Sequence, residues 1–235
     1  MASSYSTDLK LELMVTGEKA GLWGDITNTN LNILQQAIAG YQSIAVNATS
    51  GVTLTFSNGV LSNGKNAVIE LTGTLSSTSI NVVVPDGIEK TYNIKNSIDH
   101  AGKNVQVKTA SGTGVQIAEG NSYVLYSDGT NVKLVSQERN WRAISSAETV
   151  QEGAAILANT NGGAVTITLP PSPSTGAEVS FIDQGYDFDT NSLTVGRNGS
   201  NIANAAADLV VSTQGAGFTL VYSGDATTDW TYRDK

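Results

Sequence analysis

The chain has 235 residues, with 13 Lys and Arg against 21 Asp and Glu, which leaves a net charge of −8. This length is enough for one large or two small domains with cores of their own. The acidic balance provides no basic stripe to neutralise phosphates, so we expect no nucleic acid partner. The absence of cysteine excludes disulfides and thiol chemistry. No apolar run approaches the roughly 20 residues of a membrane span, so we also expect no membrane partner.

The composition favours strands and turns over long helices. Charged residues make up only 14% of the chain, and it contains 24 glycines. Gly, Ser, Thr, Asn and Val are abundant, and these types are common in turns and strands. The sequence therefore predicts a mainly β protein.

The first predicted element is a short helix that follows a glycine turn. Gly21 and Gly24 flank Trp23, so the backbone can turn freely around one large apolar side chain. Most of residues 25–30 are of helix-capping types and stand directly before an apolar run, which predicts a helix start. Gly40 predicts its end. A helix of about ten residues does not persist alone in water, so it must pack on something.

Two interpretations of this helix are open. It is either a terminal helix docked on its own domain or a contact with a partner chain. We favour the partner chain because the apolar residues cover more than one narrow stripe. The residues assigned to this anchor are Leu22, Trp23, Ile26, Leu31, Leu34 and Ile38.

Residues 44–135 predict a first β-domain made of short strands separated by turns. The Asp128-Gly129 turn between two apolar runs is a strong hairpin signal. Regular spacing without long helices predicts an antiparallel sandwich or jelly-roll-like domain. The expected strands are Val52–Phe56, Ala67–Leu71, Ile80–Val84, Thr91–Lys95, Val105–Thr109, Tyr123–Tyr126 and Val132–Val135.

Residues 136–144 interrupt this pattern and predict a connector. The stretch is locally charged and carries a single tryptophan, Trp141. We expect Trp141 either to wedge between two domains or to fill a core at the start of a strand.

Residues 145–235 repeat the plan of the first β-domain. The run Ala164–Pro170 corresponds to Ile80–Pro85, and Leu193–Val195 corresponds to Val105–Val107. The run Phe218–Asp225, which closes on residues 230–232, corresponds to the hairpin of the first half. The spacing between corresponding residues drifts, which indicates duplication with insertions. The predicted architecture is thus an anchor arm with a short helix (1–43), a β-domain (44–135), a connector (136–144) and a second antiparallel β-sandwich or jelly-roll-like domain (145–235).

Two stretches carry motifs that resemble those of a known class of proteins. Residues 17–40 contain the stretch Gly21-Leu22-Trp23-Gly24, then Asn-x-Asn-Leu and a predicted helix that ends Ala-Ile-Ala-Gly. This segment resembles the opening of fibre-like virion proteins of marine and cyanobacterial phages. Residues 145–235 resemble a β-rich module of tail fibres and tailspikes, through Leu169-Pro170, the Leu193–Gly199 stretch and Val221-Tyr222. The resemblance implies a virion location on the tail or head surface, a homotrimer, and contacts with other virion proteins in the tail or the portal and adaptor region.

Few residues suggest catalysis or metal binding. His100, the one histidine, follows Asp99 in a predicted loop, and the sequence has no nucleophile-elbow motif. Asp187, Asp189 and Asn191 alternate as at the start of a calcium loop, but the required glycine and glutamate are replaced by Ser192 and Asn198. We therefore expect no enzyme, no cofactor and no metal.

Exposed aromatic side chains are a second candidate chemistry, because they can stack on sugar rings. Trp230 and Tyr232 lie two apart on one predicted strand, so both face either a ligand or a core, and we favour the core. The candidate glycan-binding residues are Tyr186, Phe188, Trp230 and Tyr232.

Three functional classes follow from these features. We favour a non-enzymatic phage virion structural protein of the fibre or fibre-adaptor type, anchored by its N-terminal segment. The alternative is a receptor-binding adhesin that recognises a host surface glycan through the C-terminal domain. A depolymerase would need a longer β-helical body and paired carboxylates in a groove.

Overall fold

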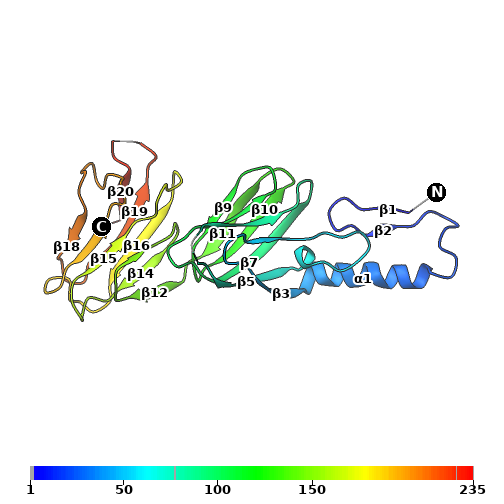
Figure 1. The fold of residues 1–235 in the computed structure, drawn as a ribbon, viewed down its shortest axis with the longest axis horizontal. Helices are drawn as coiled ribbons and strands as arrows, with labels where there is room; N and C mark the ends of the chain where they lie inside the picture. Colours follow the sequence, from blue (N-terminus) through cyan, green and yellow to red (C-terminus); the bar gives the residue numbers. More distant parts are fainter. Residues whose placement is uncertain (1–2, 77, 226, 235) are drawn as a thin grey trace. The chain divides into compact units, whose positions relative to one another are not determined.

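The computed structural model describes residues 3–76, 78–225 and 227–234 (Figure 1). Within these residues the protein is mainly β, with several sheets and a single α-helix. The chain divides into two compact units, residues 1–138 (unit 1) and 139–235 (unit 2).

Unit 1 begins with two short strands and the α-helix. Strand β1 (Ser4–Tyr5) pairs antiparallel with β2 (Glu12–Leu13). Helix α1 (Trp23–Ala39) follows and leads through Gly40 into the first sheet, as Figure 1 shows. A 3₁₀ turn, η1 (Asn63–Lys65), lies in the loop between β4 and β5.

Helix α1 has 17 residues, so the prediction of about ten was too short. Trp23 opens the helix instead of lying in a turn before it, and residues 25–30 lie within the helix. The prediction of a helix start at residues 25–30 was wrong because Asn and Thr favour helix ends only when their side chains bond to the free backbone groups there. Here the Thr29 hydroxyl bonds to the Asp25 carbonyl one turn earlier. Gly40 does end the helix, and its N–H donates to the carbonyl of Gln36.

The remaining strands of unit 1 form two sheets, in the orders β11-β10-β7-β5-β3 and β4-β6-β8-β9. From β3 to β8, each strand lies in the opposite sheet to the strand before it. The strands are β3 (Tyr41–Ala45), β4 (Val52–Thr53), β5 (Val68–Thr74), β6 (Ile80–Val84), β7 (Glu89–Asp99), β8 (Val105–Thr109), β9 (Gly114–Ile117), β10 (Ser122–Asp128) and β11 (Val132–Glu138).

Unit 2 has the same topology, in the orders β12-β14-β16-β19-β20 and β13-β15-β17-β18. Strand β12 is equivalent to β3, and strands β13 to β20 are equivalent, in the same order, to β4 to β11. The strands are β12 (Trp141–Ile144), β13 (Glu148–Thr149), β14 (Ala155–Ala158), β15 (Val165–Thr168), β16 (Glu178–Asp183), β17 (Leu193–Gly196), β18 (Leu209–Val211), β19 (Gly217–Tyr222) and β20 (Trp230–Asp234).

The sequence correspondence between the two halves matches this topology. Strands β6 and β15, whose runs end in Val-Pro and Leu-Pro respectively, hold equivalent places, as do β8 and β17. The hairpin β10–β11 around Gly129 corresponds to β19–β20. Gly129 has a φ of +80°, as the hairpin signal requires.

Strand direction corrects the expected antiparallel sandwiches. Neighbours β3, β5 and β7 run parallel, and so do β4, β6 and β8. The same holds for β12, β14 and β16, and for β13, β15 and β17. In these sheets, the last three strands of each unit pair antiparallel with their neighbours. Each unit is thus a short β-solenoid closed by antiparallel strands. Alternation of apolar residues looks the same in both directions, so the sequence could not distinguish them.

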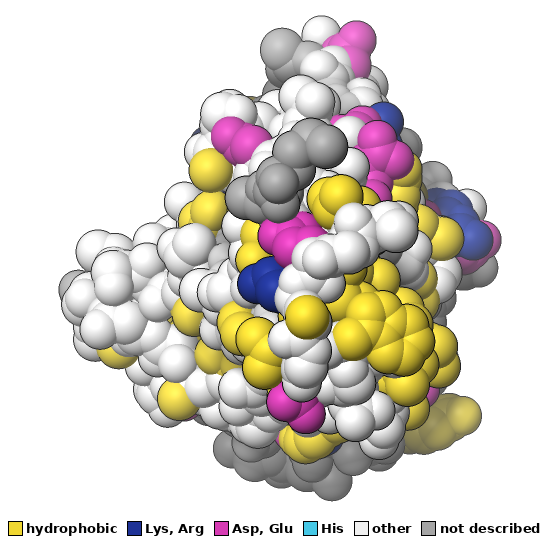
Figure 2. All heavy atoms as spheres, turned by 90° about the vertical axis from the view of Figure 1, so that its right-hand side faces the viewer, with side chains coloured by type: hydrophobic (Ala, Val, Ile, Leu, Met, Phe, Trp, Pro, Cys, Tyr) yellow, Lys and Arg dark blue, Asp and Glu magenta, His cyan; other side chains and the backbone are white. Residues whose placement is uncertain are grey.

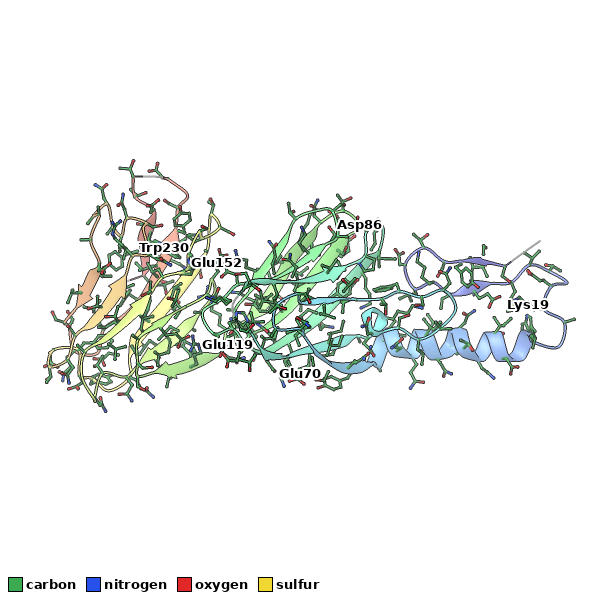
Figure 3. All side chains as sticks on the ribbon, viewed as in Figure 1. Lys19, Glu70, Asp86, Glu119, Glu152 and Trp230 are labelled. Carbon is green, nitrogen blue, oxygen red and sulfur yellow. The ribbon has the colours of Figure 1, made fainter. Side chains whose placement is uncertain are left out.

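Each unit buries a core between its two sheets. In β7, every second residue from Tyr92 to Ile98 is buried, which is the period of a strand with one face inward. The core of unit 1 joins Ile69 and Leu71 of one sheet with Val82 and Val107 of the other. The core of unit 2 includes Phe181, Leu220 and Trp230, which Figure 3 labels on β20.

A polar network crosses the outer face of the first sheet of unit 1. The carboxylate of Glu70, labelled in Figure 3, accepts hydrogen bonds from the hydroxyls of Tyr41 and Ser97. It also forms an ion pair with the Lys95 ammonium at 2.9 Å. These three contacts join β3, β5 and β7. The hydrogen bond from Tyr41 is the main cause that lowers the pKa of Glu70 to about 2, followed by those from Lys95 and Ser97.

We predict that Glu70 contributes to stability above pH 4.5, and that this contribution is lost as the pH falls toward about 2. The folded-state pKa lies below the unfolded value of 4.5, so the unfolded chain binds the proton first. Melting temperature followed by circular dichroism should fall more steeply over this range in the wild type than in Glu70→Gln. The control Glu89→Gln changes an exposed carboxylate of the same sheet and should keep the wild-type slope. Equal slopes for Glu70→Gln and wild type would contradict the assignment.

Candidate functional site

Helix α1 exposes large apolar side chains on one side. Ile38 is 79% exposed, Trp23 64% and Leu31 56%, and Leu34 is half-buried between them. Leu22, just before the helix, is also exposed, whereas Ile26 is half-buried. Exposure of this much apolar surface is unusual for a monomer and marks an interaction site.

The opposite side of α1 packs on the rest of unit 1. Ile33 is fully buried there, and it is the one residue of the helix with that status. The Asn30 side chain bonds to both backbone groups of Glu12, accepting from its N–H at 3.0 Å and donating to its carbonyl at 2.9 Å. The carbonyl of Gln36 accepts from the N–H of Ala67. The helix is therefore fixed in place while its other side stays open.

The exposed residues follow a spacing that suits helix packing. Leu31, Leu34 and Ile38 are separated by three and four positions on α1, and we call these three residues the helix stripe. This spacing is the seam along which two or more helices pack. Residues of the buried side, such as Ile33, lie on another stripe. The only charged residue of α1 is Asp25 in its first turn, so the helix stripe carries no charge.

A buried lysine fixes the loop beside the C-terminal end of α1. Lys65 is fully buried, and its ammonium donates to the carbonyls of Ser57 at 2.7 Å and Val60 at 2.6 Å. Burial lowers the pKa of Lys65 to about 8. These bonds fold the loop so that Val60 and Leu61 point outward, and Leu61 lines a shallow groove with α1 residues.

Figure 2 faces the end of the molecule at which α1 lies in Figure 1 and shows hydrophobic side chains gathered there. Acidic and basic side chains are scattered around them. Sequence reasoning identified the apolar residues of α1 but missed Val60 and Leu61 as exposed apolar side chains of a neighbouring loop. A buried lysine that shapes a loop leaves no recognisable sequence signal.

The four candidate glycan-binding residues do not form one surface. Tyr186 is 68% exposed, but Phe188 and Trp230 are fully buried in unit 2. Tyr232 is half-buried, and its ring meets that of Phe218 edge-on with centroids 6.0 Å apart. Phe188 and Trp230 therefore offer no ring face to a ligand.

The histidine and the acidic loop have structural roles. His100 is buried, and its ring nitrogens lie 2.9 Å from the Asn96 amide nitrogen and 3.2 Å from the Lys103 carbonyl. The Asp187 carboxylate accepts from the Asn191 side chain within its own loop. No group of His, Asp or Glu side chains in the described ranges could hold a metal ion.

Trp141 begins strand β12 and is 45% exposed, so it is not a core residue of unit 2. Residues 136–138 belong to β11 and residues 141–144 to β12, so most of the expected connector is strand. Among the described residues, no helix is long and apolar enough to cross a membrane.

Comparisons with known proteins give no family. No family model matches the chain, and no curated protein matches it. One similar solved structure is described as a chaperone-substrate complex, with 14% identity and a TM-score of 0.38. The match covers 81% of this chain but only 35% of the other, and a likeness this weak carries no argument about function.

We predict that Asn30 fixes α1 to β2. Asn30→Ala removes two hydrogen bonds and leaves backbone groups of Glu12 without partners, which costs about 1–3 kcal/mol. Hydrogen exchange followed by mass spectrometry should show faster exchange in peptides that contain β2. Asn28→Ala is the matched control, because Asn28 is an exposed asparagine of the same helix. Similar exchange in the two variants would show that α1 is held by other contacts.

Proposed function

We propose that this protein is a non-enzymatic structural protein of a phage virion, of the fibre or fibre-adaptor type. It is attached to the particle by its N-terminal segment. The observation that carries the proposal is the apolar side of α1, which the described residues leave exposed. The resemblance of residues 17–40 and 145–235 to phage fibre proteins supports the same assignment.

The energetics of α1 support an attachment role. Full burial of a Leu, Ile or Trp side chain is worth about 1.5–3 kcal/mol. Association costs about 4–15 kcal/mol in lost freedom, so several such side chains must be buried together to offset it. Trp23, Leu31 and Ile38 lie on one side of a helix that is already ordered, so little additional ordering is needed.

We further propose that the helix stripe packs against other copies of the chain in a homotrimer. The spacing of Leu31, Leu34 and Ile38 suits a seam between parallel helices. Neutral residues, including Asn28 and Gln35, flank the stripe, so identical helices can approach without like-charge repulsion. The number three comes from the resemblance to phage fibres. Leu22 and Trp23 then remain to contact another virion protein of the tail or the portal and adaptor region.

No catalytic role is part of this proposal. His100 is buried in a structural position, and the two solenoids are short. An adhesin that binds a host glycan through unit 2 is compatible with the same attachment.

We predict that Trp23→Ala lowers incorporation into particles without unfolding the solenoids. Trp23 is 64% exposed, so its removal should change the melting temperature of the free protein little. Quantitative immunoblotting of purified particles would measure incorporation. Trp141→Ala, which removes a half-exposed tryptophan from unit 2, is the matched control and should incorporate normally. Normal incorporation of Trp23→Ala would remove this residue from the attachment surface.

We predict a trimer in native mass spectrometry, and its dissociation to monomers in the double variant Leu31→Asn and Ile38→Asn. Two polar residues in the helix stripe would be left buried without partners in the trimer. Asn32→Ala is the control, because Asn32 is exposed on α1 but lies outside the stripe. Detection of monomer alone for the wild type at micromolar concentrations would sink the trimer proposal.

A further inference from the structure

Unit 2 contains a groove at one corner. The groove has a volume of about 590 Å³ and lies between the end of β18, the following turn, and strands β19 and β20. It is lined by Val211, residues 213–217, Phe218 and Tyr232. Small-molecule sites commonly have volumes of about 300–1,000 Å³.

An exposed tyrosine borders the groove. A Cβ atom added to Gly215, a lining residue, would lie 2.8 Å from the ring of Tyr186, so ring and backbone are in close contact. The Gln214 side chain donates to the Tyr186 carbonyl at 2.9 Å. Tyr186 has a φ of +54°, an unfavourable value for a bulky residue. Its side chain is 68% exposed.

A buried carboxylate holds the two loops of this corner together. Asp183 is 1% exposed and accepts hydrogen bonds from the backbone N–H groups of Asp187, Phe188 and Gly215. The first two belong to the loop of Tyr186 and the third to the turn that lines the groove. Asp183 therefore positions Tyr186 beside the groove.

The equivalent corner of unit 1 is closed. Phe181 pairs with Phe218 in unit 2, and Ile94 pairs with Tyr123 in the equivalent strands of unit 1, so Phe181 and Ile94 hold equivalent positions. Two residues further along these strands, Asn96 is therefore the equivalent of Asp183. The Asn96 side chain donates to the Ala118 carbonyl at 2.8 Å and contacts His100. In addition, the N–H of Ala118 donates to the Tyr123 hydroxyl at 2.6 Å.

The residues of the groove differ accordingly between the units. Ile117 of unit 1 is buried, whereas Val211, its equivalent, is partly exposed. Leu134 pairs with Leu125 in unit 1, and Tyr232 pairs with Leu220 in the equivalent hairpin of unit 2, so Leu134 is the equivalent of Tyr232. The same fold thus carries a filled corner in one unit and an open corner with two tyrosines in the other.

The chemistry of the groove fits a neutral sugar. None of the lining residues, all of which lie in the described part of the chain, is charged. Tyr186 and Tyr232 provide ring surfaces on which the apolar face of a pyranose can stack. Thr213, Gln214 and the glycine-rich turn provide hydroxyl, amide and backbone groups for sugar hydroxyls. An anionic sugar would lose hydration without gaining a cationic partner.

We propose that the groove between Tyr186 and Tyr232 binds a neutral pyranose unit of a glycan. The proposal concerns unit 2 alone and does not depend on attachment through α1, so either can fail without the other.

The test is saturation-transfer difference NMR on the full chain, with neutral oligosaccharides built from glucose, galactose, mannose and N-acetylglucosamine. Matched oligosaccharides that contain a uronic or sialic acid serve as the charged set. We expect binding of at least one neutral probe and no binding of the charged set. Titration should then show at least fivefold weaker binding of that probe by Tyr186→Ala and by Tyr232→Leu, which introduces the residue found in unit 1.

Trp141→Ala is the control, because it removes an exposed aromatic of unit 2 that does not line the groove, and it should bind as the wild type does. Tyr186→Ala should keep the wild-type melting temperature, since Tyr186 is 68% exposed. The proposal is overturned if no neutral probe binds, if only charged probes bind, or if both tyrosine variants bind as tightly as the wild type.

Discussion

The alternation of successive strands between two sheets is the constraint on which the rest of the structure depends. A parallel neighbour cannot follow through a tight turn, so the chain crosses to the other sheet and returns. Each return places a strand in register beside the previous strand of the same sheet, and it buries one more row of side chains between the sheets. Residues such as Ile69, Ile94 and Val107 therefore form a continuous core. A solenoid of this kind leaves its last coil uncovered, and in each unit the antiparallel strands that follow close it.

The ends of the solenoids are where the two units differ. At one corner, Asn96 and Asp183 occupy equivalent buried positions but differ in that only the asparagine side chain can donate hydrogen bonds. An amide can donate to a carbonyl and so draws the turn at Ala118 inward. A carboxylate can only accept, so it gathers N–H groups from two loops and leaves Tyr186 outside. A difference of one side-chain group thus accompanies a closed corner in unit 1 and an open groove in unit 2.

The sequence predicted much of the β structure and little of its connectivity. Alternating runs such as Ile80–Val84 and the Asp128-Gly129 hairpin lie in strands as expected, because burial of one face imposes a period of two. Strand direction was not accessible, since the same alternation suits parallel and antiparallel partners. The burial of Trp230 agreed with the core interpretation of that strand, whereas the burial of Phe188 depends on Asp183 and could not be read locally. For α1, composition indicated exposed apolar residues, but only the structure separates the buried side with Ile33 from the helix stripe.

The central claim is that the helix stripe of α1 is covered by the same stripe of another copy. Cysteine crosslinking tests it directly, because the chain contains no cysteine. Ile38→Cys places a thiol in the stripe, and Asn32→Cys places one at an exposed position of α1 outside it. Under mild oxidation, the account predicts that Ile38→Cys forms interchain disulfides on non-reducing gels and that Asn32→Cys does not. Equal crosslinking of the two variants, or none in Ile38→Cys, would contradict it.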